Sequence, residues 1–172
     1  MNIPESVIKA IEKNSSPLDN SYFNHARKSL SALDKVTEET YCSDYMSNAI
    51  NCLERVYKGF LKAATIKCDW YQLPKENFLT IDHDIWGIYK EIKKSFPDVF
   101  PRLDTNEWSE FRKYMLDLRT IYTDARYSTF PDYKEFLAVK DFAKSELQII
   151  EDYINEQNLE KSNEGNDFPD DF

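Results

Sequence analysis

Two arginines and two tyrosines recur at helical spacing near the end of one amphipathic segment. Arg119 and Tyr122 are three residues apart, and Arg126 follows Tyr122 after four, so these side chains share one helix face; Tyr127 comes next. Guanidinium groups bind phosphate with a planar fork and stack on aromatic rings. The spacing predicts a face that contacts phosphates and bases. The same residues are also typical of a helix end with inward-packed tyrosines and arginines paired with neighbouring aspartates.

The acidic charge of the chain is concentrated at its C-terminal end. The 172 residues carry a net charge of -9, and residues 151 to 172 hold eight acidic residues and one basic residue. The remainder therefore carries a charge of about -2. Because residues 1–150 are nearly neutral, they are compatible with a local basic groove, although the chain as a whole is acidic.

Composition and periodicity predict an all-α fold. The chain has only three glycines, and no stretch alternates long enough to form a strand. We expect an antiparallel bundle of five to six helices, with an irregular aromatic loop at 67–80. The apolar spacing predicts helices at 4–13, from Asp19 through Leu33, at 38–66, from about 80 to 96, after Pro101 through Tyr122, and at about 132–158. The helix at 38–66 should be the most buried, because its apolar stripe is unbroken.

The chain divides into three parts by composition. Residues 1–18 are expected to form an N-terminal helix and linker, and residues 19–158 the helical domain. Residues 159–172 are polar and acidic, which is typical of a disordered tail. This tail is expected either to keep the protein soluble or to dock a protein partner.

Three segments stand in order along the chain: residues 51–61, His83 with the two residues after it, and residues 122–127. Together they resemble the HEPN superfamily (higher eukaryote and prokaryote nucleotide-binding domain). Residues 51–61 resemble its QAAEKALKALL helix, with Glu54 and Lys58 at the family's Glu and Lys. His83, with the two residues after it, resembles the HDL that opens the next helix. Residues 122–127 resemble the YxxxRYP end of the helix after that, although Ser128 stands where the family has Pro. The resemblance extends over about residues 19 to 157 and implies a HEPN-like helical bundle.

The resemblance implies nucleotide or RNA binding without catalysis. Ribonuclease members place His about four to six residues after an Arg, but here Arg119 is followed by six other residues and then Arg126. A guanidinium cannot act as a general base near neutral pH. The chain is more similar to RYP-type members, which bind nucleotides without this motif. The nucleotide-binding residues that the resemblance implies are Lys58, His83, Arg119, Tyr122, Arg126 and Tyr127.

Two of these residues have an equally simple structural explanation. Glu54 and Lys58 are four apart in the favourable order, so Lys58 either completes a cationic pocket or forms a surface pair with Glu54. His83 either points into a groove or packs against Trp86. Two other functions also stay open: a HEPN ribonuclease with a displaced site (Arg119, Arg126 and His83), and an acidic helical interaction module or inhibitor.

The sequence points to a cytoplasmic protein with no cofactor. There is no apolar run long enough for a membrane span and no signal peptide, so no membrane partner is expected. Cys42, Cys52 and Cys68 lack metal-ligand spacing and are expected to be reduced core residues, and no zinc site is visible. The resemblance further implies a homodimer and a bacterial or phage defence or toxin–antitoxin setting.

Overall fold

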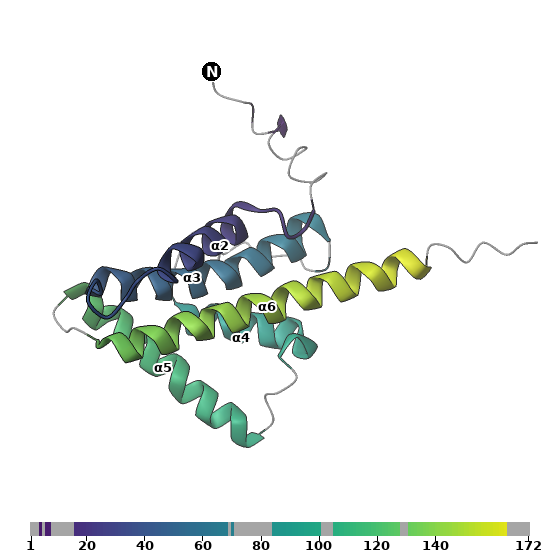
Figure 1. Cartoon of the computed structure of the whole chain (residues 1–172). Coiled ribbons are helices and arrows are strands. Elements are labelled where there is room, and N and C mark those ends of the chain that lie inside the picture. Colours follow the sequence, from purple (N-terminus) through teal and green to yellow (C-terminus); the bar gives the residue numbers. More distant parts are fainter. Residues whose placement is uncertain are drawn as a thin grey trace, which may run out of the picture.

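The protein is an assembly of helices around one central helix, α3. The computed structural model describes residues 4, 6–7, 16–68, 70, 84–100, 105–127 and 131–164. Every regular element in these ranges is helical (Figure 1), which confirms the predicted all-α fold. The elements are α2 (Ser21–Leu33), α3 (Ser43–Lys62) with a π-helical extension η1 (Ala63–Lys67), α4 (Ile85–Ser95), the 3-10 turn η2 (Pro97–Val99), α5 (Thr105–Tyr127) and α6 (Tyr133–Glu164).

Helix α3 is the core of the bundle. It contacts α2, α4, α5 and α6, and Val56 and Phe60 on it are completely buried. Figure 1 shows α2 alongside α3 and α6 passing across the bundle between these two helices and α5. The prediction that this helix is the most buried is confirmed. An apolar stripe facing several neighbours at once explains why even polar positions of α3 are removed from water.

Helix α2 is fixed to α3 by a close backbone approach. Asn20 caps α2, because its side-chain oxygen accepts from the backbone N–H groups of Tyr22 and Phe23. Its side-chain amide donates to the carbonyl of Gly59 on α3 over 3.2 Å. The ring of Phe23 lies against Gly59, where a Cβ atom would come within 2.8 Å of the ring. The missing side chain therefore sets the distance between the two helices.

Helix α6 spans the bundle and continues beyond it. A capping box starts it: the N–H of Glu135 donates to Asp132, and the N–H of Asp132 donates back to Glu135. Phe136 and Ile150 are completely buried against the core. The helix runs to Glu164, past the predicted start of the tail, and its C-terminal end projects from the bundle (Figure 1).

The helix boundaries differ from prediction at some ends. Helix α3 begins at Ser43 and not near 38, because Thr37 and Thr40 bond each other and hold a turn there. Pro97 follows the end of α4 as predicted. Most of the expected helix at 4–13, most of the loop at 67–80 and the end of the tail, 165–172, lie outside the described residues.

Within the described ranges, no helix has the length and apolarity that crossing a membrane requires.

Candidate nucleic-acid interface

The exposed face of α5 carries a line of residues at helical spacing. Arg112, Leu116, Arg119 and Thr123 are three or four residues apart and all are exposed to solvent. On the side of the helix that faces the core, Leu118 is completely buried, and Met115, at the border of the two sides, is completely buried as well. The buried side fixes the rotation of α5 and so directs the two arginines toward solvent.

The predicted arginine–tyrosine segment forms the last turns of α5. The side chain of Arg119 is exposed, and its backbone carbonyl accepts a hydrogen bond from Thr123 over 3.1 Å. Tyr122 is half-buried and packs against the apolar core. Arg126 and Tyr127 belong to the same helix, but their side chains lie outside the described residues.

Lys58 lies in the interior of the bundle. Its Nζ donates to Oε1 of Glu54 over 2.6 Å, and only 9% and 8% of the two side chains are exposed. The pair predicted from the spacing is present, but it is buried and not on the surface, because α3 has neighbours on nearly every side. Lys58 is thus engaged inside the protein, whereas Arg119 faces solvent. His83 lies outside the described residues.

A second basic cluster joins α4 to α5. The Nζ of Lys90 on α4 lies 5.6 Å from the ring centroid of Trp86, and the guanidinium carbon of Arg112 on α5 lies 5.9 Å from it. Trp86 is 7% exposed and stacks on Tyr89 at a centroid distance of 5.7 Å. Cations over an indole face are attracted to its π-electrons. Trp86 therefore contacts two positive side chains that come from different helices.

Sequence reasoning missed this cluster, because the contact of Arg112 with Trp86 depends on how α4 packs against α5. One signal was present: Arg112 precedes Arg119 by seven residues, the same interval that separates Arg119 from Arg126. Seven residues are two helical turns, so all three positions fall on one side of α5.

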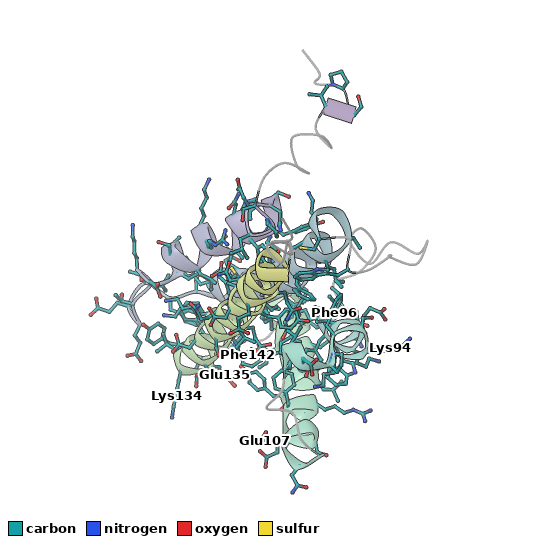
Figure 2. All side chains as sticks on the ribbon, turned by 90° about the vertical axis from the view of Figure 1, so that its right-hand side faces the viewer. Lys94, Phe96, Glu107, Lys134, Glu135 and Phe142 are labelled. Carbon is teal, nitrogen blue, oxygen red and sulfur yellow. The ribbon has the colours of Figure 1, made fainter. Side chains whose placement is uncertain are left out.

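Positive and negative charges are separated in the molecule. Helix α4 has three lysines and one acid, and α5 has four basic and four acidic residues, so the two helices together carry a net charge of +2. The part of α6 from residue 151 onward has the opposite balance, including Glu151, Asp152 and Glu156. Figure 2 shows Lys94 of α4 and Lys134, at the start of α6, on opposite edges of the molecule. The local field over α4 and α5 thus favours anions, although the whole chain is acidic.

Two cavities elsewhere are less suited to phosphate. One of about 290 Å³ lies between η2 and α6, with three carboxylates among its lining residues: Asp98, Val99, Phe100, Ile149, Asp152, Tyr153 and Glu156. The other, of about 340 Å³, lies between α2 and α6, where Arg27 is bound to Glu151 and Lys144 to Asp34. Carboxylates repel phosphate, and paired cations are already neutralised. The exposed face of α5 is the better candidate.

The cysteines differ from expectation. Among the described thiols, Cys52 is buried, as predicted, but Cys42 is exposed and Cys68 is only half-buried. All three are free. Cys42 stands at the N-cap position of α3 and not within the helix, which explains why it does not enter the core.

Comparison of the chain with models of protein families, with curated protein sequences and with solved structures found no match. The functional argument therefore depends on the residues of this chain: the three HEPN-like segments and the basic face of α5. The two lines overlap at residues 122–127 of α5, and the second adds the exposure and packing of that helix.

Proposed function

We propose that this protein is a HEPN-like domain that binds a nucleotide or RNA through the exposed face of α5, without cleaving it. One observation carries the proposal. Arg112 and Arg119 are exposed on one side of α5, two turns apart, and Arg126 follows after the same interval. Two turns rise by about 10 Å, so the three positions form a line along the helix.

The electrostatics of this face suit phosphate. Among the described residues, no carboxylate forms an ion pair with Arg112 or Arg119. A guanidinium without a carboxylate partner can offer its planar fork to a phosphate, and such charge-assisted bonds are stronger than neutral ones. Tyr122, which is half-buried beside this line, is the predicted residue for contact with a base.

Binding without cleavage follows from the residue types. Acid–base cleavage of RNA requires a group that exchanges a proton near neutral pH. No histidine follows Arg119 at the spacing of the ribonuclease motif, and Arg126, the next basic residue, stays charged. The ribonuclease alternative would need His83 to act together with Arg119 and Arg126.

A second candidate function, docking of a protein partner, is favoured by the shape and charge of α6. The helix projects beyond the bundle, and its residues from 151 onward are rich in acids (Figure 1). Such a helix suits a basic partner surface. In this case the protein would be an acidic interaction module or inhibitor.

The proposal includes a homodimer, which the HEPN resemblance implies. Pairing through the long helices would place the arginine–tyrosine segments of two subunits at a shared cleft. Light scattering at tens of micromolar protein should report twice the mass of one chain; the mass of a monomer would contradict the dimer.

A binding screen tests the function directly. The purified protein is first examined by absorbance at 260 nm for a co-purified nucleotide or RNA. Nucleotides and short RNAs are then titrated against the wild type, Arg119→Ala and a control, Lys134→Ala, whose side chain lies on the edge of the molecule opposite Lys94 (Figure 2). We expect binding that Arg119→Ala weakens and Lys134→Ala preserves, with the RNA recovered intact.

A further inference from the structure

The basic surface of α5 does not end at Arg112. That side chain and Lys90 of α4 share the ring of Trp86, at 5.9 and 5.6 Å from its centroid. Lys94 is exposed one turn beyond Lys90, so it lies on the same side of α4. The cations thus continue from one helix to the other.

The lysines of α4 differ in their contacts. Lys93 donates to the carbonyls of Pro97 and Phe100 over 3.0 and 3.1 Å, so it closes the turn after α4. Among the described residues, neither Lys90 nor Lys94 forms an ion pair with a carboxylate. Both are exposed, and both keep their charge available to a ligand.

We propose that Lys94, Lys90, Arg112 and Arg119 form a cationic track across α4 and α5 that binds single-stranded RNA over several nucleotides. This inference rests on the proposed function, because the α5 end of the track is its binding face. Arg112 and Arg119 alone are separated by about 10 Å of helix, and α4 lengthens the track beyond the reach of one mononucleotide. The ligand class is therefore an RNA strand rather than a free nucleotide.

Trp86 positions the track and does not stack on bases. It is 7% exposed, with Tyr89 stacked at a centroid distance of 5.7 Å and two cations near its ring. A single strand suits this surface because it can bend from one helix to the other, following a line of charges. An acidic peptide also carries negative charge, but it lacks the phosphates that a guanidinium fork fits best.

The test compares two probes, a labelled mononucleotide and a labelled single-stranded RNA of about twelve nucleotides, by fluorescence anisotropy. The variant is the double substitution Lys90→Ala with Lys94→Ala, two exposed lysines of α4, and the matched control is Lys28→Ala with Lys134→Ala, two exposed lysines of α2 and α6. We expect the test variant to weaken RNA binding by roughly tenfold or more and to leave mononucleotide binding unchanged. The slope of log affinity against log salt should fall in magnitude by about 1.4 for two lost phosphate contacts. The control variant should change neither the affinity for RNA nor the slope against salt.

Three results would overturn the track. If RNA binding is unchanged in the Lys90/Lys94 variant but weakened by Arg119→Ala, α4 is not part of the binding surface, and the proposed function still holds. A poly-glutamate peptide of equal charge that binds as tightly as the RNA would assign the surface to acidic proteins. If Arg119→Ala changes binding of neither probe, the proposed function fails as well. Thermal melting of each variant confirms that lost binding does not come from lost folding.

Discussion

The hydroxyl of Tyr57 on α3 donates to Oε2 of Glu146 on α6 over 2.9 Å, and both side chains are completely buried. The rings of Tyr89 and Phe100 lie beside Tyr57, at centroid distances of 5.9 and 6.2 Å. A carboxyl group in such apolar surroundings needs hydrogen-bond donors. The Tyr57–Glu146 hydrogen bond supplies such a donor, and it links α3 and α6, two helices that contribute much of the core.

Tyr57→Phe should lower the free energy of unfolding by about 1–3 kcal/mol, because Glu146 loses a donor where water cannot replace it. Urea unfolding followed by circular dichroism measures this loss. The control is Tyr133→Phe, which removes a half-buried bond to the carbonyl of Val36 and should cost less. Equal losses in the two variants would contradict the assigned role of Tyr57.

Lys58→Met should destabilise the protein by about 3–5 kcal/mol, since it leaves the carboxylate of Glu54 buried without its cation. Replacing both partners, with Glu54→Leu added to Lys58→Met, should recover part of the loss. Lys28→Met, at an exposed site on α2, serves as the control and should be close to neutral. A stable Lys58→Met protein that has lost nucleotide binding would instead assign Lys58 to the site.

Gly59→Ala should destabilise the protein, although alanine is the better helix former by about 1 kcal/mol. The new Cβ would lie 2.8 Å from ring atoms of Phe23 and push α2 away from α3, a form of overpacking that costs about 1–3 kcal/mol. Gly87→Ala is the matched control, because its Cβ would meet the rotatable carboxylate of Asp84. The melting temperature of Gly59→Ala should be lower than that of the wild type, and that of Gly87→Ala should be equal to it or higher. The reverse order would contradict the packing argument.

Stability should fall as the pH rises from about 9 to 12. Burial raises the pKa of the Cys52 thiol from 9.0 to about 11, although the charge of Arg55 and a hydrogen bond with Ser29 lower it. Burial, and then the charge of Glu146, raises the pKa of Tyr114 from 10.0 to about 12. The folded state holds both protons more strongly than the unfolded chain, so their contribution is complete below pH 9 and is lost through this window.

The measurement for this pH dependence is the urea midpoint at intervals from pH 8 to 12. The double variant Cys52→Val with Tyr114→Phe lacks both titrating groups and should show a shallower decline over the same range. An identical decline in the wild type and the double variant would mean that other groups cause the alkaline loss.

The core was predictable from the sequence, and part of the candidate site was not. The stripe through Val56 and Phe60 identified the central helix, because apolar spacing reports burial directly. The burial of Glu54 and Lys58 could not be predicted from the sequence. Two opposite charges four residues apart are compatible both with an exposed helix and with a helix that has neighbours on most sides. The approach of Arg112 to Trp86 of α4 depends on the packing between helices, which local periodicity does not encode.

Arginine substitution on α5, with binding and melting measured on the same preparation, tests the central claim most directly. Arg126→Ala and Arg119→Ala should each weaken nucleotide or RNA binding by on the order of 1–3 kcal/mol, the scale of one charge-assisted contact. The melting temperature should stay the same for Arg119→Ala, because an exposed arginine contributes little to stability. Binding should also weaken as salt rises. Unchanged affinity in both variants would contradict the assignment of this face as the binding site.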